Sequence, residues 1–207
     1  MKIQSAHTYF FIKRLHSLTG IIPLGLFLME HFFSNSYAFK GAESFNKLVS
    51  TLQSIPILIF IEVGFIFLPL IFHAVLGLII TYMGSNNFVT YSYARNWLYF
   101  FQRVTGVLMF IFIIVHVWST RISTALEGRE ITFSDMQRIF APTWAKWFYA
   151  VGILSAAYHL SNGISSALIT WGITVSRRSQ RIAMVLSLVL FVVMGAWGIF
   201  IMRTFSR

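Results

Sequence analysis

Residues 57–83 read ILIFIEVGFIFLPLIFHAVLGLIITYM, and this stretch decides the fold class. At about 1.5 Å of rise per residue, a helix of this length exceeds the roughly 30 Å thickness of the hydrocarbon core of a bilayer. Its only acidic or basic side chains are those of Glu62 and His73. We therefore predict a transmembrane helix, and we expect functional roles for both side chains because ionisable groups are costly inside a membrane.

Four other apolar stretches extend this prediction to the whole chain. They cover approximately residues 15–35, 98–120, 145–175 and 182–202, and each is long enough to cross a bilayer. The connections are short and none resembles a domain linker. The sequence therefore predicts an all-α integral membrane protein, a bundle of five transmembrane helices forming a single domain over residues 1–207. No small-residue cleavage site follows the first apolar stretch, so we predict no removable signal peptide.

The composition supports a membrane protein and excludes several other classes. Of the 207 residues, 57% are hydrophobic and 11% are charged, whereas soluble domains carry about 25% charged residues. The net charge of +10 comes from Lys and Arg that lie between or at the ends of the apolar stretches, so we exclude nucleic-acid binding. The absence of cysteine excludes disulfides, iron–sulfur ligation and covalently attached haem in this chain.

The distribution of basic residues predicts the orientation in the membrane. The side that carries the N-terminus has eight Lys and Arg and no acidic residue, whereas the other side has eight that are diluted by Glu43, Glu127, Glu130 and Asp135 over longer loops. Short loops that are dense in positive charge face the cytoplasm. We therefore predict a cytoplasmic N-terminus and an external C-terminus.

Four histidines, His31, His73, His116 and His159, lie one on each of the first four predicted helices. His31 and His116 lie on helices that enter from the inner side, at about 20–25 Å from the inner boundary, and therefore in the outer half. His73 and His159 lie at matching distances along helices that enter from the outer side, and therefore in the inner half. We predict two pairs, His31 with His116 and His73 with His159, at levels roughly 10–15 Å apart.

Two neutral imidazoles that face each other across a helix bundle suit the iron of a bis-His haem, which transfers electrons and has no open position for oxygen. Zinc would require three or four ligands at one depth. Gly77 and Gly163 each lie one turn after a histidine on the same face, where a missing side chain would let a porphyrin approach. We therefore predict two b-type haems. The alternative is four unrelated interhelical hydrogen bonds, with ordinary close packing at the glycines.

A weak internal repeat accompanies these histidines. HSLTG at residues 16–20 matches QRVTG at residues 102–106, and FHAVLG at residues 72–77 matches YHLSNG at residues 158–163. The repeat indicates that the first and second predicted helices form a pair that resembles the third and fourth.

Three further residues are predicted to contact the cofactors without binding iron. Arg14, His16 and Arg103 lie at the cytoplasmic ends of their helices, near the level of the inner haem, where positive charge suits a haem propionate. His16 would also suit a quinone or a partner subunit. His7 lies in the polar N-terminal segment, and we expect it to be solvated.

Glu30 and Glu62 are the only carboxylates within the predicted spans. Both lie near the level of the outer haem, where they could exchange protons with a quinone as electrons are transferred. The alternative is that both are interfacial residues that reach for water among the lipid headgroups.

These residues lie in motifs that resemble those of a known family. The chain is similar, nearly end to end, to the di-haem cytochrome b membrane anchors of succinate:menaquinone oxidoreductases of the Bacillus type. The motifs that carry this resemblance are RLHSL at 14–18, LPLIFHA at 68–74, YSYARNW at 91–97, QRVTG at 102–106, HVWSTR at 116–121, HLSNG at 159–163, TWGIT at 170–174 and RSQR at 178–181.

The resemblance implies two haem b groups in a bacterial cytoplasmic membrane. His73 and His159 would bind the inner, higher-potential haem, and His31 and His116 the outer, lower-potential haem. It also implies a flavoprotein subunit with FAD and an iron–sulfur subunit on the cytoplasmic face. Electrons from succinate would pass through both haems to menaquinone near the outer face, or in reverse during fumarate reduction. Related fumarate reductases use a Glu for proton transfer at the position of Ala157, so that pathway is not expected here.

Two other functions remain compatible with the residues. One is a cytochrome b anchor of a different quinone-linked dehydrogenase, which copurified soluble subunits would identify. The other is a haem-free proton-coupled transporter whose histidines relay protons.

Overall fold

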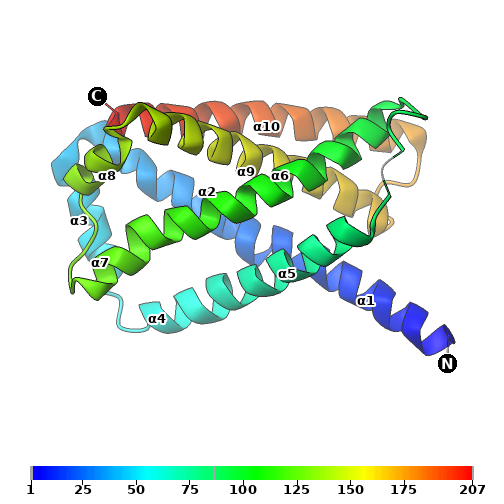
Figure 1. The fold of residues 1–207 in the computed structure, drawn as a ribbon, viewed down its shortest axis with the longest axis horizontal. Helices are drawn as coiled ribbons and strands as arrows, with labels where there is room; N and C mark the ends of the chain where they lie inside the picture. Colours follow the sequence, from blue (N-terminus) through cyan, green and yellow to red (C-terminus); the bar gives the residue numbers. More distant parts are fainter. Residues whose placement is uncertain (1, 86, 207) are drawn as a thin grey trace.

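The computed structural model describes residues 2–85 and 87–206, with side chains described from Thr8 onward. These residues form helices joined by short loops (Figure 1). In chain order the elements are α1 (Lys2–Ile21), α2 (Pro23–Asn35), the 3-10 helix η1 (Ser36–Lys40), α3 (Ala42–Gln53), α4 (Leu58–Ile61), η2 (Glu62–Phe67), α5 (Leu68–Met83), α6 (Ala94–Val117), η3 (Trp118–Ile122), α7 (Ser123–Leu126), α8 (Phe133–Phe140), α9 (Thr143–Thr170) and α10 (Arg177–Phe205).

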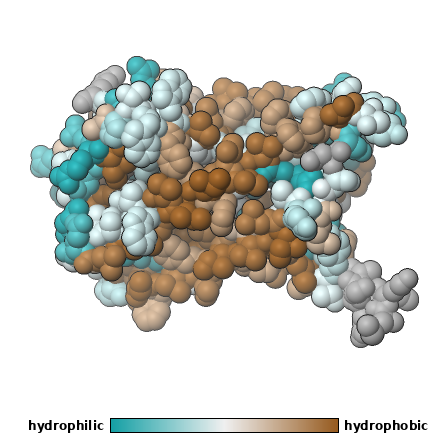
Figure 2. All heavy atoms as spheres, viewed as in Figure 1, coloured by the Kyte–Doolittle hydropathy of each residue, from teal (hydrophilic) through white to brown (hydrophobic). Residues whose placement is uncertain are grey.

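Several of these elements join end to end into long rods. Within the described part of the chain, four rods are long and apolar enough to cross a membrane, namely Thr8–Lys40, Leu58–Met83, Ala94–Leu126 and Arg177–Phe205. They correspond to four of the five predicted spans. Figure 2 shows the matching surface, in which apolar side chains form a broad middle zone between two more hydrophilic ends. This distribution is expected of a protein whose middle lies in hydrocarbon.

The fifth predicted span, residues 145–175, corresponds to α9, which is long but is not among these four. Its buried residues include Ser155, Ser161, Asn162 and Ser165, and such polar residues lower its mean hydropathy. They do not face lipid, because α9 packs closely against both α10 and α6. Small residues at these positions allow helix backbones to approach closely. A membrane crossing by α9 therefore stays a prediction.

Two of the rods contain a π-helical segment, η2 and η3. A π turn inserts an extra residue into the helix and is often found at functional sites. Glu62 begins η2 and Arg121 lies in η3, and their side chains form an ion pair across the two rods. The two distorted segments thus meet at a pair of opposite charges.

One end of the bundle is covered by α3, α7 and α8 together with the end of α10 (Figure 1). The aromatic side chains of Phe45, Phe133 and Phe205 contact one another there, with ring centroids 5.0–6.1 Å apart. Thr132 caps α8 by accepting from the Asp135 amide. Burial raises the pKa of Asp135, but hydrogen bonds from Thr132 and the charge of Arg129 outweigh it, so the pKa lies below its ordinary value.

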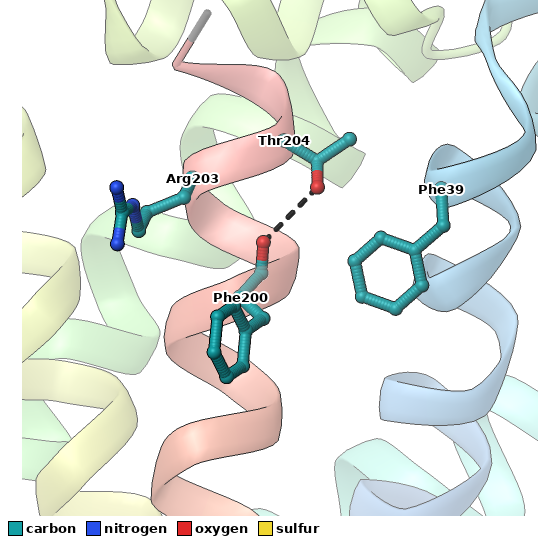
Figure 3. Close-up of a pocket in the computed structure, with 4 residues that line it drawn as sticks. All are labelled: Phe39, Phe200, Arg203 and Thr204. Atoms are coloured by element: carbon teal, nitrogen blue, oxygen red, sulfur yellow. Dashed lines mark hydrogen bonds between the residues drawn. The ribbon is translucent and has the colours of Figure 1, made fainter.

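A surface pocket of about 270 Å³ lies at the same end, between α10 and η1. Figure 3 shows Phe39 facing Phe200 and Thr204 across it, with Arg203 on the opposite side of α10. A second, apolar pocket of about 390 Å³ is an open surface groove between α6, α9 and α10, lined in part by Thr105. Neither pocket is lined by one of the four predicted ligand histidines, although Thr105 of the second pocket lies beside His159.

Candidate functional site

The structure brings the four histidines together in the two predicted pairs. His73 on α5 and His159 on α9 have ring centroids 6.2 Å apart. His31 on α2 and His116 on α6 have ring centroids 5.8 Å apart. Each pair joins two different helices, and all four histidines are half-buried.

These separations can be compared with the geometry of a metal held between two imidazoles. A ligand nitrogen lies about 2 Å from its metal, and the ring centre lies about 1 Å further back, so two axial imidazoles have centroids about 6 Å apart. Both observed separations, 5.8 and 6.2 Å, are close to this value. The two pairs therefore fit the iron of two bis-His haems.

The inner pair, His73 and His159, is oriented by main-chain carbonyl groups. His73 Nδ1 lies 2.9 Å from the carbonyl oxygen of His16, and His159 Nδ1 lies 3.0 Å from that of Gln102. A ring nitrogen that faces a carbonyl must donate, so Nδ1 carries the proton and Nε2 keeps its lone pair. A threonine hydroxyl lies 3.5 Å from each Nδ1, on Thr19 and Thr105 respectively. The weak sequence repeat thus corresponds to a repeated arrangement around both histidines.

HSLTG and QRVTG each end in a glycine that faces the ring of a predicted ligand histidine. A Cβ atom added to Gly20 would lie 2.5 Å from Cε1 of His73, and one added to Gly106 would lie 3.0 Å from Cε1 of His159. A side chain at Gly20 would force the His73 ring to move, and one at Gly106 would make an unusually tight contact with His159. These two glycines were not predicted as site residues, although the matching motifs contain both of them.

The two glycines that were predicted to face a porphyrin, Gly77 and Gly163, instead face the side chains of His16 and Gln102. An added Cβ at Gly77 would lie 3.1 Å from Nε2 of His16, and one at Gly163 would lie 3.3 Å from Nε2 of Gln102. In the structure, Gly77 and Gly163 therefore make room for the side chains of His16 and Gln102. Their contact with a haem stays a prediction.

His16 lies directly against the inner pair. Its ring stacks on that of His73, with centroids 4.0 Å apart and planes 9° from parallel. Its Nε2 is buried and has no hydrogen-bond partner among the described residues. His16 is thus placed to contact a group bound at the inner pair.

The two arginines predicted to bind propionates contact helix ends. The Arg103 guanidinium donates to the carbonyl groups of Thr81 and, over 2.8 Å, Gly84, at the end of α5. Arg14 donates to the Thr170 carbonyl over 3.2 Å, at the end of α9. Positive charge at a helix C-terminus stabilises the helix. Both arginines therefore have a structural role, and a propionate contact stays a prediction.

The outer pair is surrounded by side chains rather than carbonyl groups. Nδ1 of His116 lies 3.3 Å from the Tyr149 hydroxyl, and the His116 ring stacks on Phe112 with centroids 5.4 Å apart. His31 contacts the ring of Phe27, with centroids 5.5 Å apart. The Asn35 amide donates to the His31 carbonyl over 2.8 Å.

The two carboxylates differ in their surroundings. Glu62 accepts two hydrogen bonds from Arg121, over 2.9 Å from Nε and 2.7 Å from Nη2. Glu30 is exposed and accepts a hydrogen bond from Ser34. The sequence analysis did not assign Arg121, although it ends the quoted motif HVWSTR. The side chain of His7, which was expected to be solvated, lies outside the described residues.

Comparisons with known proteins identify the family. Residues 85–196 match the family described as the succinate dehydrogenase/fumarate reductase transmembrane subunit. The chain is also 45% identical, over 195 residues, to the succinate dehydrogenase cytochrome b558 subunit of Bacillus subtilis (strain 168). This alignment covers 94% of this chain and 96% of the relative. The chain therefore belongs to the family of succinate dehydrogenase/fumarate reductase transmembrane subunits.

Proposed function

We propose that this membrane anchor subunit carries electrons across the bilayer through two haem b groups, each held between two histidines. The single observation that supports this most strongly is the spacing of the pairs, 5.8 Å for His31 and His116 and 6.2 Å for His73 and His159. The B. subtilis relative is named a cytochrome b558 subunit, which agrees with haem b as the bound group.

The protein's own residues hold and orient these groups. His73 and His159 donate from Nδ1 to carbonyl oxygens, which would leave the lone pair of each Nε2 free to bind a metal. When bound, haem supplies reversible one-electron chemistry. The chain thus fixes the positions of two redox groups at two levels.

We further propose the partners and the direction of electron transfer. A flavoprotein with FAD and an iron–sulfur subunit would dock on the cytoplasmic side, at the end with the start of α1. Electrons from succinate would reach the inner pair first, then the outer pair, and then menaquinone near the outer face. Glu62, and to a lesser degree Glu30, would exchange protons with the quinone. The reverse path would support fumarate reduction.

The alternatives are less well supported. A haem-free transporter has no need for pairs of imidazoles whose ring centroids lie about as far apart as those of two axial ligands of one iron. An anchor of a different dehydrogenase is disfavoured by the similarity to a named succinate dehydrogenase subunit over most of the chain.

Histidine substitutions in the complete complex test the proposal. We expect His73→Ala and His159→Ala to remove the same b-type component from a potentiometric titration, because each would leave the same iron with one ligand. His31→Ala and His116→Ala should both remove the other component. His7→Ala is the control and should leave both. If His73→Ala and His159→Ala removed different components, or if the purified protein lacked b-type absorption, the proposal would be wrong.

A further inference from the structure

The two histidine pairs differ in what their Nδ1 atoms contact. Both inner histidines face main-chain carbonyl oxygens, which no substitution can remove. In the outer pair, Nδ1 of His116 instead faces a side chain, the hydroxyl of Tyr149, over 3.3 Å. A single substitution can therefore remove the hydrogen-bond partner of one predicted ligand without changing the other three.

Tyr149 is held firmly in this position. It is 5% exposed, and its ring packs edge-on against Phe112 and Phe140, with centroids 5.2 and 4.6 Å apart. Phe140 belongs to α8, the short helix that covers this end of the bundle. A tyrosine with its ring enclosed by other aromatic side chains has little freedom to turn its hydroxyl away from His116.

The Tyr149 hydroxyl also lies near the side chain of Ser119. The Ser119 hydroxyl donates to the main-chain carbonyl of His116 over 3.2 Å. If Nδ1 of His116 donates to Tyr149, the phenol proton is free to bond to Ser119, and the three side chains form a series of hydrogen bonds. Hydrogen bonds in series polarise one another, which strengthens each bond.

We propose that Tyr149 is a positioning residue for the outer haem, and that it accepts the Nδ1 proton of His116 so that Nε2 binds the iron. This inference rests on the proposed function. A partner on the second ring nitrogen fixes the tautomer and ring orientation of a ligand histidine and makes the imidazole a stronger electron donor. Tyr149 therefore favours the oxidised form of the outer iron and lowers its midpoint potential, while the inner pair depends on carbonyl groups and is unaffected.

Tyr149→Phe in the complete complex tests this inference. It removes one oxygen atom and keeps the ring, so the aromatic packing is preserved. We expect a positive shift of the outer midpoint potential and a changed low-spin EPR signal of that haem, with the inner midpoint unchanged. The matched control is Tyr158→Phe, which removes the same atom from the same helix. The Tyr158 hydroxyl donates to the Leu98 carbonyl over 3.2 Å, so its loss should leave the outer midpoint in place.

A second variant keeps the inference testable if Tyr149→Phe loses the outer haem altogether. Ser119→Ala leaves the phenol in contact with His116 but removes the partner of its proton, so we expect a smaller positive shift in the same haem. If Tyr149→Phe keeps the outer haem, an unchanged outer midpoint potential overturns the inference. If Tyr149→Phe loses that haem, an unchanged outer midpoint potential in Ser119→Ala overturns it. An equal shift of both haems also overturns it. These outcomes differ from failure of the proposed function, in which the unaltered protein itself would lack two b-type components.

Discussion

At the scale of single residues, Arg121 changes what Glu62 is expected to do. Bidentate contacts between an arginine and a carboxylate are stronger and more directional than single hydrogen bonds, and this pair lies within two candidate spans. An unpaired charge there would be costly. Any proton exchange between Glu62 and a quinone would therefore take place beside the Arg121 guanidinium.

Glu62→Gln tests the role of this carboxylate. Glutamine keeps the size of the side chain but cannot take up a proton, and general acid–base groups typically contribute at least about 100-fold to a rate. We therefore expect quinone reduction by the complex to fall by about that factor, with both haems retained. Glu43→Gln, in the first turn of α3, is the control and should react normally. Normal quinone reactivity in Glu62→Gln would exclude the proposed role.

Depth along a helix could be predicted from the sequence, whereas the partners of each side chain could not. The rise of a helix is constant, so the spacing of His31, His73, His116 and His159 gave pairs that the structure also brings together. Arg121 and Tyr149 were missed because contact with Glu62 or His116 depends on how neighbouring helices are rotated. Apolar composition carries little information about that rotation.

At the scale of elements, the approach of α1 to α5 depends on Gly20. An added Cβ there would lie 2.5 Å from the His73 ring, closer than two carbon atoms can approach. The stacking of His16 on His73 fills the neighbouring space, so the ring has little room to move aside. The α1 and α5 helices can therefore hold His73 in place only while residue 20 lacks a side chain.

Gly20→Ala should weaken the inner haem site and leave the outer one intact. Overpacking a filled site typically costs about 1–3 kcal/mol, and here the displaced group is a predicted iron ligand. Haem content and a potentiometric titration of the purified complex measure the effect. The matched control is Gly64→Ala, since an added Cβ at Gly64 meets nothing within 4 Å. Full inner haem occupancy in Gly20→Ala would contradict the close contact between α1 and His73.

The apolar elements were predictable to different degrees. The spans near residues 15–35, 57–83, 98–120 and 182–202 were found because their side chains face lipid and are therefore apolar. The helix α9 is more polar because Ser161, Asn162 and Ser165 are buried against other helices, where packing replaces hydropathy as the constraint. The short helices α3 and α8 are amphipathic and cover the end of the bundle, and the sequence analysis did not assign them.

At the scale of the whole molecule, the two ends of the bundle have different coverings. The loop residues 84–85, 87–93 and 171–176 lie at the same end as the start of α1, whereas α3, α7, α8 and the end of α10 lie at the other (Figure 1). The first end carries the start of α1, where we propose that the soluble partners dock. At the second end, Phe140 of α8 packs against Tyr149, which in turn contacts His116 of the outer pair.

The position of iron in the protein decides whether each histidine pair holds a haem. Crystals of the complete complex, measured at the iron absorption edge, would locate each metal atom by its anomalous scattering. The account predicts two iron peaks in this subunit, one between His31 and His116 and one between His73 and His159. The absence of iron from either position, or an iron atom ligated by other residues of this chain, would contradict it.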